Sequence, residues 1–190
     1  MDFSEQFLEL ARKRTVQNAD RIEYRLVDAT DETQLVSLGQ DRFDAAVCTM
    51  AFMDMASIGP LASALPQILK SNGHFVFSVL HPCFNNSNSR LTAEEEYRDG
   101  ELVQVLSVKT SQYVHPWAER GIGMRGQPHT QLYFNRPLHE LLKPFLDAGF
   151  VLDGLEEPAF EEAPPDMVGF LSWQRFREIT PVLVARLRLR

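Results

Sequence analysis

Polar residues end or follow two apolar segments near the start of the sequence, and a third polar residue stands next to the first residue. Asp2 stands close to the first residue, and Asp28 comes directly after the apolar segment 22–27. Thr49 is the last residue of a second apolar segment, 43–49. If these segments are parallel strands, the polar residues leave the carboxyl edge of a sheet, where open parallel sheets bind ligands. Carboxylates at that edge accept hydrogen bonds from hydroxyl and amino groups, so the pattern indicates a site for a polar small molecule.

Each of these residues also has an ordinary structural interpretation. Asp2 can be a solvated residue near a chain end, and Asp28 can cap a helix or close a turn. Met50, which follows Thr49, can be part of the core, as methionine commonly is. The residue types alone leave these alternatives open.

His81 is the candidate for acid–base chemistry. It follows the apolar segment 75–80 and precedes Pro82, which places it at the same carboxyl edge. A histidine there can accept a proton or orient a substrate. A single histidine next to a proline is more commonly structural, so both roles remain open.

Apolar periodicity predicts the elements that position these residues. Residues 4–14 have helical spacing, with Ser4 as the N-cap and basic residues in the last turn. A second helix is predicted over 58–69, with Asn72 and Gly73 as its left-handed stop. Segment 43–49 is expected to be a strand buried on both faces, and the last two strands are expected to be antiparallel. The remaining predicted elements are strands at 22–27, 75–80, 150–155 and 182–189 and a helix at 138–146.

Residues 85–131 lose this periodicity, apart from one short strand predicted at 102–108. So long a connection in a compact domain is usually a lid or a binding loop. We therefore predict a single domain over 1–190 with an insertion or substrate loop at 85–131. The aromatic and histidine residues in or beside it either line a substrate pocket or anchor packing; they are Tyr113, His115, Trp117, His129 and Tyr133.

Four segments, in this order, resemble successive motifs of class I S-adenosylmethionine-dependent methyltransferases of the type 11/12-like group. They are 2–11, 28–29, 43–54 and 69–82, and the resemblance continues through 136–138 and 146–150 to the last strand. It implies an α/β, Rossmann-like, mostly parallel sheet with an antiparallel C-terminal strand. It also implies an enzyme that transfers a methyl group from S-adenosylmethionine to a small-molecule acceptor.

The resemblance further implies which residues bind the cofactor. Asp2, with Phe3 beside it, takes the place of the ribose ligand. Asp28 takes the place of the carboxylate that receives the adenine amino group, with the Ala29 amide beside the ring. The segment after 43–48 lines the methionine half. The implied set is Asp2, Phe3, Asp28, Ala29, Thr49, Met50 and Ala51, with no metal and no obligatory catalytic residue.

The family pattern begins with a strand and a glycine-rich turn, and only Met1 precedes Asp2 in the sequence. The pair Gly121 and Gly123 follows no predicted strand and opens no helix, so it is a poor substitute. We therefore expect the first strand of the fold to be missing, through a misplaced start, a fragment or a decayed relative. In the first two cases, in-frame DNA upstream of Met1 encodes an apolar strand that ends in glycines.

Two other functions compete with methyl transfer. A non-catalytic binding or oligomerisation module is favoured by the missing glycine turn. A nicotinamide-dependent oxidoreductase shares the topology but needs the same turn, and the segment 80–82 gives it no support.

Composition limits the partners, the cysteine chemistry and the cellular location that we expect. The formal net charge of -7 disfavours nucleic acid as a partner. Cys48 and Cys83 are too few for a disulfide framework and lack zinc-site spacing. We find neither a membrane-spanning run nor a signal peptide, so we expect a soluble, cytoplasmic protein of undetermined oligomeric state.

Overall fold

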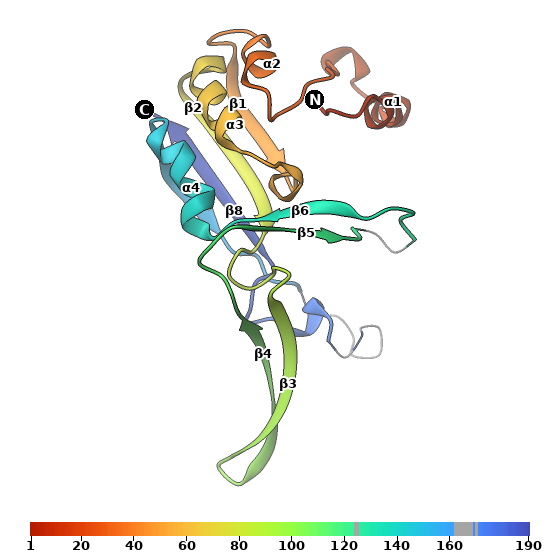
Figure 1. The fold of residues 1–190 in the computed structure, drawn as a ribbon, viewed down its shortest axis with the longest axis vertical. Helices are drawn as coiled ribbons and strands as arrows, with labels where there is room; N and C mark the ends of the chain where they lie inside the picture. The colour runs from red at the N-terminus through yellow and green to blue at the C-terminus, as the bar shows by residue number, and fades with distance from the viewer. Residues whose placement is uncertain (124–125, 162–168, 170) are drawn as a thin grey trace.

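A four-stranded mixed sheet forms the centre of the computed structural model, which describes residues 1–123, 126–161, 169 and 171–190. β1 pairs parallel with β2, whereas β8 pairs antiparallel with both β2 and β7. Three strands therefore run in one direction and the C-terminal strand is reversed, as expected (Figure 1). The strands, in sheet order, are β1 (Phe43–Thr49), β2 (Leu69–Leu80), β8 (Val182–Leu189) and β7 (Phe150–Glu156).

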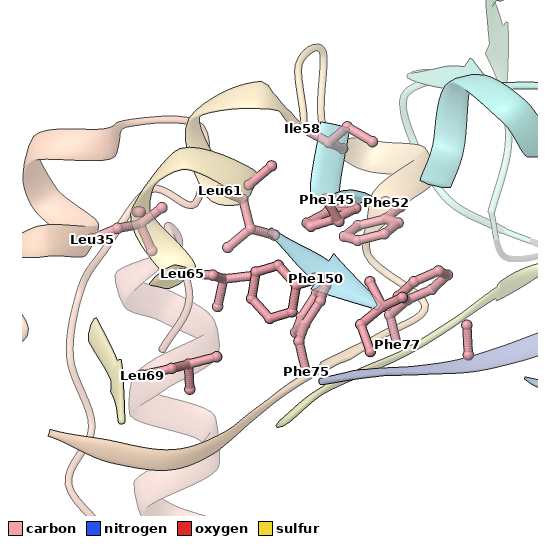
Figure 2. Packing of buried hydrophobic residues seen from close by; sticks show 14 of the residues in the cluster. Leu35, Phe52, Ile58, Leu61, Leu65, Leu69, Phe75, Phe77, Phe145 and Phe150 are labelled. Atoms are coloured by element: carbon pink, nitrogen blue, oxygen red, sulfur yellow. The ribbon is translucent and has the colours of Figure 1, made fainter. Parts of the chain in front are cut away.

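Helices α3 (Gly59–Ile68) and α4 (Leu138–Asp147) contact each other and the strands β2 and β7. Between them and the sheet lies an aromatic cluster, in which the rings of Phe52 and Phe145 stack at 5.8 Å between centroids (Figure 2). Phe75 and Phe77 join it from alternate positions of β2. All four phenylalanines are fully buried. Their close packing holds α4 and the segment after β1 against β2, beside the candidate site.

β1 differs from its prediction as a strand buried on both faces. It is one of the two edge strands of this sheet, and the side chain of Val47 is 70% exposed. Its alternating burial shows that only part of the strand packs on the core. An apolar strand therefore presents an open hydrogen-bonding edge on this side of the sheet.

The N-terminal part contains α1 (Glu5–Arg14), whose N-cap Ser4 accepts from the Phe7 amide, as predicted. The prediction of a strand at 22–27 is wrong. A single parallel bridge joins Asp2 to Leu26, and the short helix η1 (Ala19–Arg21) precedes it. A strand needs a partner along its length, and here only one residue pair provides it.

The end of the second predicted helix also needs correction. α3 ends at Ile68 and β2 begins at Leu69, so Asn72 and Gly73 lie inside the strand. Asn72 does adopt a left-handed conformation, with φ of 61°. It lies where the register between β1 and β2 shifts, so the pair forms a bulge in the strand and not a helix stop.

The described residues of 85–131 are not an irregular loop, so this expectation was wrong, although the one short strand predicted at 102–108 lies within β4. They form a long hairpin of β3 (Ser89–Arg98) and β4 (Glu101–Thr110), followed by β5 (Trp117–Gly121), which pairs with β6 (Gln131–Asn135). The β3–β4 hairpin points away from the sheet, whereas β5–β6 lies near the end of β1 (Figure 1). The remaining short elements are α2 (Glu32–Val36), η2 (Phe52–Asp54) and η4 (Trp173–Arg175). No helix among the described residues is long and apolar enough to cross a bilayer.

Candidate functional site

A pocket of about 550 Å³ opens at the carboxyl ends of β1 and β2. Met50 contributes from the end of β1, and Leu80 and Pro82 contribute from the end of β2. The β5–β6 hairpin forms the opposite wall, and Phe52 of the aromatic cluster lies at the base. The pocket therefore lies at the edge of the sheet where the sequence predicted ligand binding, and its size suits a small organic molecule.

Met50 has an unusual backbone where β1 ends. Its φ is 51°, in the left-handed region that residues with a side chain seldom adopt. Its amide donates to the Ser78 carbonyl of β2 at 2.9 Å, so the pairing of the two strands holds the conformation. Backbone held in a disfavoured conformation at the mouth of a pocket is typical of functional sites.

The inward face of the β5–β6 hairpin is polar and aromatic. Directly opposed residues of an antiparallel pair share a face, and three opposed pairs line the pocket. These pairs are Trp117 with Asn135, Glu119 with Tyr133, and Gly121 with Gln131. The outward face carries Leu132, which is 45% exposed. A hairpin that packs on a core has the opposite distribution, so this face is built for hydrogen bonding into the pocket.

Gly121 and Gly123 form the surface on which the Tyr133 ring lies. A Cβ on Gly121 would stand 2.9 Å from Cε2 of Tyr133, and one on Gly123 would stand 2.5 Å from its hydroxyl oxygen. Both distances are shorter than real Cβ contacts, so the ring touches backbone at both positions. The glycine pair set aside as a cofactor motif therefore shapes the pocket wall.

Arg136 fastens the hairpin to the segment after β1. Its Nη1 donates to the carbonyl of Phe52 at 2.9 Å, and its Nη2 donates to the carbonyls of Met55 and Ala56 at 2.5 and 2.9 Å. A longer bond of 3.4 Å reaches the Phe134 carbonyl. Burial lowers the pKa of the guanidinium from its usual value. These carbonyls occupy both terminal nitrogens of Arg136, which therefore acts as a clamp.

Two carboxylates line the same pocket. Asp54 lies at its exposed rim and accepts from Nε2 of Gln131 at 3.0 Å, while Glu119 accepts from Nδ2 of Asn135 at 3.2 Å. Desolvation raises the pKa of Asp54, and the hydrogen bond from Gln131 partly opposes that shift. Desolvation and the nearby charge of Asp54 together raise the pKa of the Tyr133 hydroxyl. The rim and the hairpin wall are therefore electrostatically linked.

The residues expected to bind adenosine form a second group. The Asp2 carbonyl accepts from the Val27 amide at 3.0 Å, which puts Asp2 beside the residue that precedes Asp28. One carboxylate oxygen of Asp2 accepts from the Ser4 amide, and one of Asp28 accepts from the amide and hydroxyl of Thr30. Both aspartates thus stabilise their own turns, as the ordinary interpretation of Asp28 predicted; for Asp2 that interpretation was a solvated residue near the chain end. Phe3 beside them is 74% exposed.

The structure brings the predicted residues together in two sets. Asp2, Phe3, Asp28 and Ala29 lie around the bridge between Asp2 and Leu26. Thr49 ends β1, and Met50 lines the pocket after it. Among the described residues, neither Asp2 nor Asp28 lines this pocket. The predicted cofactor role of each residue remains a prediction.

His81 is buried, with 3% of its surface exposed. Its Nδ1 accepts from the Cys83 amide at 3.1 Å, which leaves the proton on Nε2 to donate to Glu157 at 2.8 Å. The ring also stacks on Phe84 at 4.5 Å between centroids. Both ring nitrogens have protein partners, so this geometry favours a positioning role over proton transfer.

The aromatic and histidine residues in or beside 85–131 fall into three groups: some line the pocket, one anchors packing and two are exposed. Trp117 and Tyr133 line the pocket. The Tyr113 hydroxyl instead accepts from the Leu138 amide at 2.8 Å and ties the loop to α4. His115 and His129 are exposed. Sequence reasoning missed Asp54, Glu119 and Arg136, and the alternation of Trp117, Glu119 and Gly121 was the signal that could have found the hairpin face.

Comparisons with known proteins agree with this geometry. A family model described as a methyltransferase domain matches residues 1–77. An S-adenosylmethionine-dependent methyltransferase from Mesorhizobium loti aligns with a TM-score of 0.68 and 20% identity over 98% of this chain and 77% of that one. A candidate S-adenosylmethionine-dependent methyltransferase from Listeria monocytogenes gives a TM-score of 0.68 and 20% identity over 99% and 78%. No curated protein matches the sequence.

A further solved structure is that of the glycopeptide N-methyltransferase MtfA complexed with S-adenosylmethionine. It aligns with a TM-score of 0.56 and 12% identity over 98% of this chain and 75% of that one. The chain therefore has the Rossmann-like fold of class I S-adenosylmethionine-dependent methyltransferases, and its first 77 residues match their family model.

Proposed function

We propose that this chain transfers a methyl group from S-adenosylmethionine to a small-molecule acceptor. The observation that carries the proposal is the left-handed Met50 at the end of β1, where the pocket of about 550 Å³ begins. The family resemblance assigns this segment to the methionine half of the cofactor. A reactive methyl bound there would therefore face the pocket, and an acceptor in the pocket would lie next to it.

The residues present fit the chemistry of the cofactor. Adenosine offers donors in its ribose hydroxyls and adenine amino group, and Asp2 and Asp28 are acceptors. Within the described residues, the hydrogen bonds to each carboxylate use Oδ1, so Oδ2 can accept from a ligand. Phe3 and Ala29 flank these acceptors, and Thr49, Met50 and Ala51 follow at the end of β1. When bound, the cofactor supplies an electrophilic methyl group on a sulfonium sulfur.

The chain itself contributes orientation and exclusion of water. Arg136 holds the segment after β1 against β6, and the β5–β6 hairpin covers the acceptor side. Alignment of a nucleophile with a methyl group supplies much of the rate enhancement of such a reaction, with no acid–base residue strictly required. We propose that His81 positions the segment after β2 through Cys83 and Glu157.

One observation favours the alternative function, a binding or oligomerisation module that keeps the fold without catalysis. The outer edge of β1 is unpaired in the described sheet, and Val47 is 70% exposed there. An open apolar edge is a surface for strand addition from another chain. Cofactor binding separates the two functions, because a module of this kind does not need it.

Titration calorimetry with S-adenosylhomocysteine tests the proposal. It is performed on this chain and on a chain extended by any in-frame upstream residues. We expect saturable binding to at least one of them, and Asp28→Asn to weaken it about tenfold, because the amide loses the charge that attracts the adenine amino group. The matched control is Asp20→Asn, in the exposed helix η1.

The outcomes separate the parts of the proposal. Absence of binding to both chains overturns methyl transfer and leaves the module. Binding that is unchanged by Asp28→Asn removes the adenine assignment alone.

A further inference from the structure

The inward face of the β5–β6 hairpin has more hydrogen-bonding groups than the fold itself needs. In the described chain, Glu119 is held by one hydrogen bond, from Asn135, through its Oε1. Asp54 is likewise held by one hydrogen bond, from Gln131, through its Oδ1. Each carboxylate therefore has a second oxygen that can accept from a ligand in the pocket.

The charge of the pocket selects against anions. The described lining residues that carry charge are Asp54, Glu119 and Arg136. Arg136 gives its terminal nitrogens to backbone carbonyls, as shown above, so it offers a ligand little. The two carboxylates remain, and they attract a cation or a hydrogen-bond donor while they repel a ligand carboxylate.

The pocket also contains two aromatic rings in fixed positions. Trp117 donates from Nε1 to the Ser87 hydroxyl at 2.9 Å, which holds the indole against the loop after β2. The Tyr133 ring lies on the backbone of Gly121 and Gly123. Rings held this way bind a flat or cationic ligand with little loss of side-chain entropy.

We propose that the pocket binds, as the methyl acceptor, a small aromatic or heteroaromatic molecule that carries an amine. Glu119 and Asp54 hold the amine, and Trp117 and Tyr133 contact the ring. The inference rests on the proposed function, because it names the substrate class for the same site.

The chemistry of an amine acceptor is balanced without a further reactant. An amine that binds as its ammonium ion first gives one proton to solvent. The lone pair of the neutral amine then forms the new N–C bond while the S–C bond of the donor breaks, and the electrons of that bond stay on sulfur. The positive charge thereby moves from sulfur to nitrogen. A carboxylate beside the nitrogen stabilises the charge as it develops, so Glu119 and Asp54 favour the transition state as well as the complex.

Three probes of equal size test the proposal by calorimetry on the full chain, namely 2-phenylethylamine, 2-phenylethanol and phenylacetate. We expect the amine to bind about tenfold more tightly than the alcohol, because a charge-assisted hydrogen bond is stronger than a neutral one. Phenylacetate should bind least. Glu119→Gln should reduce the preference for the amine to about threefold or less. Glu101→Gln, at the exposed start of β4, is the matched control and should change nothing.

The result that overturns the proposal is an amine that binds no more tightly than the alcohol, or that does not bind at all. A preference for the amine that survives Glu119→Gln and Asp54→Asn together also overturns it. S-adenosylhomocysteine is titrated into the same variants. If the cofactor binds neither this chain nor the extended chain while the amine preference holds, the proposed function fails and the pocket assignment stands. If the cofactor binds and the preference is absent, the pocket assignment alone fails.

Discussion

Replacing Arg136 with methionine should loosen the pocket wall from the sheet while the apolar part of the side chain is kept. The guanidinium is the group that joins β6 to the carbonyls of Phe52, Met55 and Ala56. Its ring contact with Phe134, at 5.9 Å from Cζ to the centroid, would also be lost. Methionine fills a similar volume but donates no hydrogen bond.

The size of the effect follows from the bonds. Three of them are short and one, to the Phe134 carbonyl, is long at 3.4 Å. A hydrogen bond in a folded protein contributes about 0.5–1.5 kcal/mol net, and carbonyls near the surface regain water when the donor is removed. We therefore expect a loss of about 2–3 kcal/mol in the free energy of unfolding, which lowers the melting temperature by about 5–10 °C for a chain of this size.

Urea denaturation followed by circular dichroism measures this loss. The control is Arg120→Met, on the outward face of β5, where the side chain is exposed; it should change stability by less than about 0.5 kcal/mol. If Arg136→Met is as stable as the wild-type protein, the carbonyl contacts contribute nothing and the clamp is refuted. A fall in stability equal to that of Arg120→Met would lead to the same conclusion.

Two further predictions concern the pocket wall and β1. Gly121→Ala should displace the Tyr133 ring, because the new Cβ would stand 2.9 Å from it, and calorimetry should show weaker binding of 2-phenylethylamine. Gly59→Ala, with an ordinary 3.5 Å contact, is the control, and equal binding by both variants would contradict the packing described. Burial raises the pKa of Cys48 to about 11, so less of its thiol is ionised at pH 8 than in the unfolded chain. In a Cys83→Ala variant, iodoacetamide should label Cys48 about a hundredfold more slowly when folded than in urea, and equal rates by mass spectrometry would disprove its burial.

Most of the central sheet could be predicted because its strands are apolar segments and its helices show apolar periodicity, as in other α/β proteins. The apolar segment 43–49 is a strand with the predicted bounds, and α1 begins at the predicted cap Ser4. Antiparallel pairing of the last two strands also followed from the missing helix between them. In these elements local propensity and tertiary packing favour the same structure.

The strand predicted at 102–108 lies within β4, whereas the other three hairpin strands were missed for a physical reason. β3 carries the consecutive residues Glu94, Glu95 and Glu96, and the β5–β6 hairpin turns polar residues inward. None of these strands therefore shows a long apolar run or a regular alternation of polar and apolar residues. The turn of the first hairpin did leave a signal, since Asp99 and Gly100 both adopt positive φ, as a tight two-residue hairpin turn requires. Burial of β1 depends on which strands lie beside it in the sheet, and the residues of β1 alone do not reveal those neighbours.

The location of the candidate site could be predicted from the sequence, whereas several of the residues that line it could not. Strand order placed Met50 at a ligand-binding edge, where the pocket lies. Glu119 and Asp54 escaped notice because isolated acidic residues are usually solvated surface residues. Only the register of the β5–β6 hairpin shows that Glu119 faces inward.

The β3–β4 hairpin has a consequence for the behaviour of many copies in solution. Within the described chain its strands pair only with each other, so both outer edges could recruit a neighbour and extend into a fibril. The consecutive residues Glu94, Glu95 and Glu96 set negative charge on both faces of β3. A second copy aligned on that edge would bring acid against acid, so the triplet discourages aggregation.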